Sequence, residues 1–305
     1  MDPLAGARLV IGVAGLLVAA TSDVRARRVA DPLWIVLGTA GLFLASYEVL
    51  ASTTGIERLA VVLASAILFY AVFFGEALFD ERGWRPRPLR LGAFGLAGVL
   101  VVVSGAATFA RGGADATAYA ELLTMPIMVL VYQGFYQVGL LHGGADAKGM
   151  IALTLLVPTY PDTSPFPLVP VDPRMEPAMH LLFPFSLVAF VDAAVLYLVL
   201  PLAFLVFNAS RGDLRFPQAL FGYRADLEPL PRNAWLMDRI DDRGEHVLVL
   251  FPRRGRNPAD EARRLQEAGI SRAWVQPKIP FMVPLVAGYV AAFLVGNFLV
   301  VGFFG

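Results

Sequence analysis

The sequence LAGARLVIGVAGLLVAAT at residues 4–21 contains one charged residue, Arg8, and the basic sequence SDVRARR follows it at residues 22–28. An apolar segment of about 20 residues has the length of a helix that crosses the hydrocarbon core of a membrane. Positive residues close to one end of such a helix indicate the cytoplasmic side. This stretch therefore predicts a first transmembrane helix whose C-terminal end faces the cytoplasm.

Similar apolar segments recur along the whole chain. We expect further membrane spans at Pro32–Ala51, Leu59–Phe79, Leu91–Phe109, Tyr119–Leu141, Lys148–Tyr160, His180–Asn208 and Phe281–Phe304. The span at Lys148–Tyr160 is short and leads into a proline-rich loop. The predicted fold class is an all-α polytopic membrane protein with about eight transmembrane helices.

The composition supports this class and excludes others. Hydrophobic residues make up 57% of the 305 residues and charged residues only 16%, against roughly 25% charged in a soluble domain. The 25 basic and 25 acidic residues cancel, which argues against a partner nucleic acid and leaves the lipid bilayer as the expected surroundings. The chain contains no cysteine, which excludes disulfides, thiolate metal sites and cysteine catalysis.

The basic residues orient the predicted spans. With the N-terminus outside, every Lys and Arg except Arg8, Arg58, Arg111 and Arg174 falls on the cytoplasmic side. Cytoplasmic loops of membrane proteins are enriched in these residues. We therefore expect a multi-pass protein of the cell membrane with its N-terminus outside.

A polar segment interrupts the apolar pattern near the end of the chain. Within it, His246–Phe251 and Arg272–Gln276 resemble short strands, and Asn257-Pro258 resembles the start of a helix that Gly269 ends. These elements predict a small cytoplasmic module of β-α-β order. The predicted domains are residues 1–208 with seven transmembrane helices, the α+β module at 209–277, and the last helix at 278–305.

Acidic residues at membrane depth are costly and are therefore functional candidates. The candidates are Asp23, Glu48, Glu76, Glu121, Asp146 and Asp192. Asp23 ends the first span and Asp146 precedes the sixth, so the predicted topology places both at the cytoplasmic membrane border. Position alone leaves structural alternatives open. Asp146 is also suited to cap a helix, and Asp23 to pair with a neighbouring arginine.

Two sequence motifs strengthen the functional interpretation. The stretch Ser22–Asp31 (SDVRARRVAD) resembles the first aspartate motif of type IV prepilin peptidases. Gly143-Gly144-Ala145-Asp146-x-Lys148 resembles the G-x-G-D motif of the GxGD membrane aspartyl proteases, with Ala145 in place of the second glycine. Trp274–Pro284, Leu220–Tyr223 and Trp235–Met237 resemble segments of the archaeal, preflagellin peptidase branch. His142, which precedes the second motif, is expected to be structural.

The resemblance implies an aspartic endopeptidase with Asp23 and Asp146 as its catalytic pair and Gly143, Gly144, Ala145 and Lys148 as motif residues. It implies neither a metal nor a cofactor. The implied substrate is a precursor of an archaellin or pilin-like subunit, with a basic n-region, a small residue before the cut and an apolar helix after it. The predicted spans place two more helices between the two motifs than the six-helix members of the family have.

Three other interpretations remain. An ion-coupled transporter would use intramembrane acids such as Asp192, but the sequence shows no inverted repeat. A presenilin-like protease would carry a Pro-Ala-Leu segment, which is absent. A membrane scaffold without activity would need neither aspartate. We expect Asp192 to be structural, hydrogen-bonded to a neighbouring helix, because about 24 Å of helix separates it from the cytoplasmic end of its span.

Overall fold

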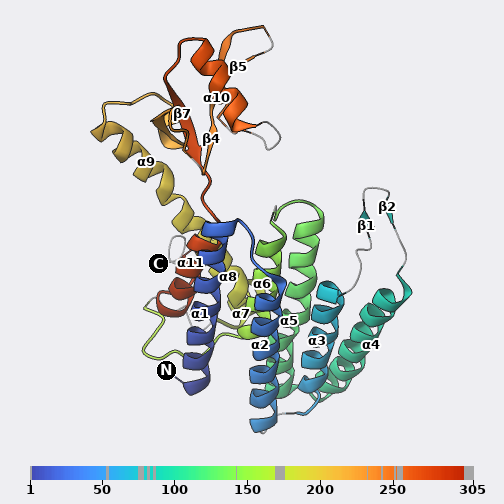
Figure 1. The fold of residues 1–305 in the computed structure, drawn as a ribbon. Coiled ribbons are helices and arrows are strands. Elements are labelled where there is room, and N and C mark those ends of the chain that lie inside the picture. The colour runs from blue at the N-terminus through green and yellow to red at the C-terminus, as the bar shows by residue number, and fades with distance from the viewer. Residues whose placement is uncertain are drawn as a thin grey trace. The chain divides into compact units, whose positions relative to one another are not determined.

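The structure, a computed structural model, describes residues 2–52, 55–74, 79–80, 83–84, 87–141, 143–168, 176–231, 233–241, 243–250, 252 and 257–298. Contacts divide the chain into two compact units. One comprises residues 1–194 with 281–305, and the other comprises residues 195–280. The first unit is a bundle of helices, and the described part of the second contains two α-helices and two short sheets (Figure 1).

Five described helical segments are long and apolar enough to cross a membrane. They are α1 (Pro3–Ala26), α2 (Asp31–Ala51), α4 (Pro88–Arg111), α5 (Gly113–Gln137) and the span Phe185–Ser210, which α8 (Phe185–Tyr197) and α9 (Val199–Ser210) form together. Shorter helices accompany them, namely α3 (Arg58–Phe74), α6 (Gly144–Leu156), α7 (Glu176–Leu182) and α11 (Met282–Leu294). The prediction of an all-α polytopic membrane protein is confirmed.

The starts of the long helices follow from local sequence. The side chain of Asp2 accepts hydrogen bonds from the N–H groups of Leu4 and Ala5 at 3.1 and 3.3 Å. An Asp at this position satisfies N–H groups that have no partner within the helix. Proline stands in the first turn of α1, α2 and α4, where it lacks only an N–H that the helix does not use.

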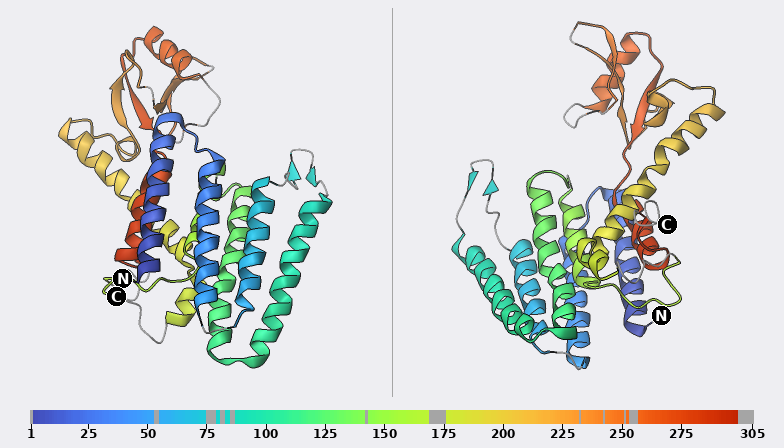
Figure 2. Two further views of the ribbon diagram at one scale, coloured as in Figure 1. Left: turned by 60° about the horizontal axis from the view of Figure 1, so that its bottom comes forward. Right: turned by 180° about the vertical axis from the view of Figure 1, so that it is seen from behind.

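Helix α6 is the most buried element of the first unit. Nine of its 13 residues are buried, and it packs against α2 and α5. Gly41 on α2 lies directly against the backbone of Leu155 and Leu156, so that a side chain at residue 41 would collide with α6. The helices α2, α3, α4 and α5 stand side by side in the bundle, and α11 lies against α1 (Figure 2).

Several predicted span ends were wrong. Helix α3 ends at Phe74, and Phe79 belongs instead to strand β1 (Phe79–Asp80), which pairs antiparallel with β2 (Gly83–Trp84). Helix α6 begins at Gly144, not Lys148, and ends before Pro158, which disfavours a helical conformation in the preceding residue. Apolar composition marks a span well but does not set where regular structure begins and ends.

The predicted span His180–Asn208 was also wrong at its start. Helix α7 ends at Leu182, and α8 begins only after Pro184. Proline has no N–H to donate and restricts the residue before it, so the apolar run breaks there. The described membrane span starts at Phe185.

The second unit is built around strand β7 (Arg272–Pro277). Strands β3 (Tyr223–Asp226) and β4 (Ala234–Leu236) pair with its two edges, both antiparallel. A separate pair consists of β5 (Asp238–Ile240) and β6 (His246–Leu248). The short helix η1 (Gln218–Leu220) precedes the sheet, and α10 (Pro258–Glu267) packs on β4 and β5.

The predicted β-α-β order is present in β6, α10 and β7. Asn257 caps α10 by accepting from the N–H of Ala259, and Gly269 ends it with a φ of 79°, as the sequence predicted. However, the strands on either side of α10, β6 and β7, belong to different sheets. The predicted strand also reaches Phe251, which lies outside the described residues. Leu265 and Val275 form the centre of the small core.

Helix α9 belongs by its contacts to the second unit. The side-chain amide of Asn208 donates to the carbonyl oxygens of Ala219 and Gly222 at 3.0 and 2.7 Å. A domain boundary after residue 208 stays a prediction, as does the side of the membrane on which the second unit lies.

Candidate active site

Asp23 lies in the last turn of α1, where the chain turns toward α2. The helix ends at Arg27, which adopts the left-handed conformation with a φ of 55° and donates its N–H to the carbonyl oxygen of Asp23. The hydroxyl of Ser22 donates to the carbonyl oxygen of Arg28 at 2.7 Å. These bonds hold the turn in one conformation. The carboxylate of Asp23 also interacts with the backbone N–H of Met282, at the start of α11.

Asp146 lies in the first turn of α6, and its backbone N–H donates to the carbonyl oxygen of Gly143 at 3.0 Å. Its carboxylate folds back over Gly143 and interacts with the N–H of that residue. A side-chain carbon added at Gly143 would collide with this carboxylate. The first glycine of the motif is therefore needed for the conformation of Asp146. Ala145, which replaces the second, is partly exposed.

The two carboxyl groups act on each other. Asp146 lies in the first turn of α6, which is not among the helices long enough to cross a membrane. Burial, together with the negative charge of nearby Asp23, raises the pKa of Asp146 from 3.8 to about 6. Two carboxyl groups that are close together do not readily ionise at the same time, so one of them keeps its proton to a higher pH. The last turn of α1 and the first turn of α6 lie at the same end of the bundle (Figure 2).

Lys148 adds an ion pair beside this carboxyl pair. Its ammonium group donates to both carboxylate oxygens of Asp31, at 2.6 and 2.7 Å. Asp31 is the first residue of α2, and Lys148 is on α6. The sequence marked both residues as parts of motifs but did not pair them. The spacing of Lys148, two residues after Asp146, was the available signal.

The other acidic candidates have different surroundings. Glu48 pairs with buried Arg8 at 2.5 Å, and Glu121 lies 3.9 Å from His180. Glu76 and His142 lie outside the described residues. Among the residues that the structure describes, no three His, Cys, Asp or Glu side chains form a cluster that could hold a metal ion.

Asp192 is fully buried in α8. Its Oδ1 accepts a hydrogen bond from the backbone N–H of Phe298 at 3.0 Å, while its Oδ2 has no partner within the described part of the chain. The predicted hydrogen bond of Asp192 is thus confirmed, with a backbone donor that follows α11.

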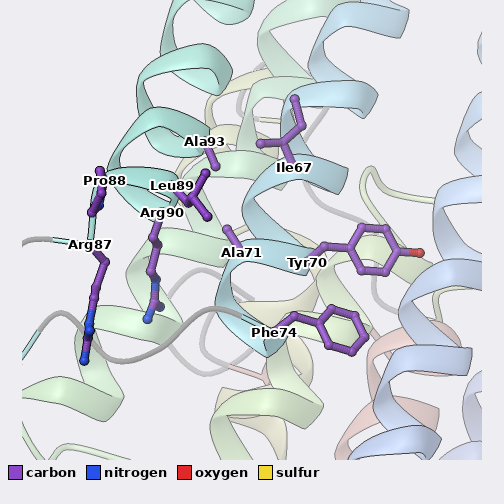
Figure 3. A pocket seen from close by; sticks show the side chains of 9 residues that line it. All are labelled: Ile67, Tyr70, Ala71, Phe74, Arg87, Pro88, Leu89, Arg90 and Ala93. Carbon is purple, nitrogen blue, oxygen red and sulfur yellow. The ribbon is translucent and has the colours of Figure 1, made fainter.

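A cavity of about 610 Å³ lies between α3 and α4, away from both aspartates. Tyr70 and Phe74 line it from α3, and the side chains of Arg87 and Arg90 lie at the start of α4 (Figure 3). The guanidinium of Arg90 lies 5.6 Å from the ring centre of Phe94. None of the candidate catalytic residues lines this cavity.

Comparison with known families bears on the C-terminal part of the chain. Residues 215–298 match a family model described as the archaeal peptidase A24 C-terminus, type II. The match includes the sheet of the second unit and all of α11. A search of curated proteins finds no match. The family match supports, for the C-terminal part of the chain, the resemblance that the sequence shows to the archaeal branch of the prepilin and preflagellin peptidase family.

Proposed function

We propose that this archaeal A24-type peptidase is a membrane-embedded aspartyl endopeptidase that uses Asp23 and Asp146 as its catalytic pair. The observation that carries the proposal is the electrostatic interaction between two carboxyl groups that come from the ends of different helices. Structural caps and ion pairs do not require two acids to approach each other. A proton shared between two carboxyl groups does require them to be close together.

The chemistry needs one neutral and one ionised carboxyl group. Burial and the charge of nearby Asp23 raise the pKa of Asp146, so we assign Asp146 as the neutral member of the pair. Ionised Asp23 takes a proton from water, and the water oxygen bonds to the scissile carbonyl carbon while Asp146 gives its proton to the carbonyl oxygen. The diol intermediate then loses its C–N bond. As that bond breaks, Asp23 gives its proton to the departing nitrogen and Asp146 takes a proton from a hydroxyl of the diol. One water is consumed, and the pair returns to its singly protonated state.

The proposed substrates are archaellin or pilin-like precursors, cleaved at the cytoplasmic face of the membrane. Such a precursor has a basic n-region, a small residue before the cut and an apolar helix after it. The position of the pair supports this class, since Asp23 lies in the last turn of a membrane-spanning helix and Asp146 in the first turn of a buried one. A cut at that level would release a water-soluble leader and leave the apolar helix in the bilayer.

The test is cleavage of a panel of such precursors by the purified full-length protein in lipid nanodiscs, with products identified by mass. Cleavage directly before the apolar helix is expected, and Asp146→Asn serves as the matched inactive control. A wild-type protein that cleaves no precursor of this form, or an Asp146→Asn variant that cleaves as fast, would contradict the proposal.

A further inference from the structure

An apolar groove of about 560 Å³ runs along the first unit between α1 and α11. Leu17 and Ala20 line it from α1. One face of α11 and the residue after it supply the rest, namely Val283, Val286, Ala287, Val290, Ala291, Leu294 and Val295. Every lining side chain is Ala, Val or Leu. The opposite face of α11, which includes Met282, Leu285 and Tyr289, is buried in the bundle. The groove is therefore the outward face of a helix that is otherwise packed.

The groove begins beside Asp23, one member of the candidate catalytic pair. On α1, Ala20 lies one turn before Asp23, and residues three or four apart share one face of a helix. On α11, the groove starts at Val283, the residue after Met282, whose backbone N–H interacts with the carboxylate of Asp23. From Val283 to Val295 the groove extends about 18 Å along a helix with a rise of 1.5 Å per residue.

We propose that this groove holds the apolar helix of the precursor while its scissile bond lies at Asp23 and Asp146. The inference rests on the proposed function, in which the apolar helix begins directly after the cut. A helix that starts at the pair has one continuous apolar path on α1 and α11, about 12 residues long. The groove contains no charged or polar side chain, which suits an uncharged helix and would exclude the basic n-region.

Small residues in the groove favour a helix as its occupant. In the bilayer, helices associate by close packing at small residues, often spaced four apart. Ala287 and Ala291 have this spacing on α11, and Ala20 faces the same groove from α1. A lipid chain is the alternative occupant, but it has no reason to select a groove that ends beside the carboxyl group of Asp23.

The first experiment fills the groove. Ala287 is exposed on α11, so Ala287→Phe adds volume to the groove without entering the bundle. We expect kcat/KM for the full precursor, relative to that for a short peptide with the same cleavage site but no apolar helix, to fall at least about tenfold, the equivalent of 1.4 kcal/mol. Ala107→Phe is the matched control, since Ala107 is exposed on α4 and should leave both values unchanged.

The second experiment detects the bound helix directly. Because the chain has no cysteine, Val290→Cys in an Asp146→Asn background gives one site for cross-linking to single cysteines along the precursor helix. Cross-links are expected at one helical face of the precursor, repeating every three or four residues. Val102→Cys on α4, a position that is 69% exposed, is the control and should show no such period.

The outcomes separate the two proposals. Two results would overturn the proposal that the groove binds the precursor helix, and both would leave the proposed peptidase activity in place. One is normal cleavage of the precursor by Ala287→Phe. The other is equal cross-linking from Val290→Cys and Val102→Cys. Periodic cross-links with no cleavage by the wild-type protein would support the groove and contradict the proposed activity.

Discussion

The ammonium group of Lys148 lies 2.6 and 2.7 Å from the two carboxylate oxygens of Asp31. This ion pair joins the first residue of α2 to α6 beside the candidate active site. Asp31 follows Asp23 after a short turn, and Lys148 follows Asp146 by two residues. The ion pair therefore connects the two segments that carry the proposed catalytic carboxyl groups, and we interpret both of its members as positioning residues.

Loss of this ion pair should lower activity more than stability. We expect Lys148→Met to lower kcat by about tenfold or more, because a displacement of about 1 Å at a catalytic group is costly. The free energy of unfolding should change by no more than about 1 kcal/mol, since both side chains are partly exposed. The measurements are precursor cleavage and thermal unfolding in nanodiscs.

Two controls separate positioning from a structural effect. The exchange Asp31→Lys with Lys148→Asp restores an ion pair and should recover part of kcat. Glu57→Gln removes the ion pair between Glu57 and Arg111, with atoms 2.8 Å apart, and should leave kcat unchanged. Equal loss of kcat in Glu57→Gln and Lys148→Met would count against the positioning role.

The sequence predicted those features that depend on local chemistry. Apolar length identified the membrane helices, because a bilayer requires about 20 apolar residues in succession. Asn257 and Gly269 marked the start and end of α10 for a similar reason, since the required cap and the positive φ are properties of single residues. The family match at residues 215–298 agrees with the motifs quoted from that region.

Features that depend on distant contacts were not predicted. Strands β3, β4 and β5 have only three or four residues each, and β3 and β4 owe their regular form to pairing with β7, far along the chain. The ion pair of Lys148 with Asp31 joins residues 117 positions apart. The need for Gly143 became visible only with the conformation of the Asp146 carboxylate.

The proposed catalytic pair predicts the behaviour of two asparagine variants. Asp23→Asn and Asp146→Asn should each lower kcat by about 10²–10⁴-fold, the usual contribution of general acid–base catalysis. The double variant should be no slower than either single one, because paired groups act as a unit. Kinetics with one precursor and comparable amounts of folded protein test this, and additive losses would contradict a shared mechanism.

The rate should depend on pH in a bell shape. Cleavage needs one ionised and one neutral carboxyl group, so it falls when both are protonated at low pH and when both are ionised at high pH. The basic limb should report a value near the raised pKa of Asp146, about 6, although such values belong to the pair. The pH profile of kcat/KM provides the measurement. A rate that stays constant from pH 5 to pH 8 would argue against this pair.

Stability provides an independent check on that pKa. Asp146 binds its proton more tightly in the folded protein than in the unfolded chain, so its contribution is present below the unfolded pKa, near 3.9, and is lost as the pH rises to about 6. Asp146→Asn removes this dependence. The variant should therefore unfold at a higher temperature than the wild type at pH 7 and at a similar temperature at pH 4.

The predicted topology can be tested by cysteine labelling in intact cells. Arg263→Cys lies on α10, where the native side chain is 69% exposed, and should react with a membrane-impermeant maleimide only after permeabilisation. Ala114→Cys, in the exposed start of α5, should react without it. This difference follows from the distribution of basic residues. The opposite pattern would reverse the orientation and place the proposed active site outside.

Asp192 tests whether the proposed pair is complete. Its Oδ1 accepts the N–H of Phe298 at 3.0 Å, and a charged Asp at the centre of a membrane helix costs about 2.5–3.5 kcal/mol. Asp192→Asn keeps a hydrogen-bond acceptor and removes the charge, so cleavage should stay within a few-fold of wild type. Asp192→Leu leaves the Phe298 N–H without its acceptor and should lower the free energy of unfolding by about 1–3 kcal/mol.

The contrast between these two variants decides what Asp192 does. A structural acceptor is indifferent to charge, so only the leucine variant should be impaired, and mainly in its unfolding temperature. A residue that binds or releases protons during function needs its carboxyl group. In that case Asp192→Asn would lower activity as much as Asp192→Leu. If Asp192→Asn folds normally and is as inactive as Asp146→Asn, then Asp23 and Asp146 are not the whole site. An ion-coupled function would use the carboxyl group of Asp192, whose Oδ2 has no partner among the residues that the structure describes. Such a function would then account better for a charge-bearing residue in the middle of the span.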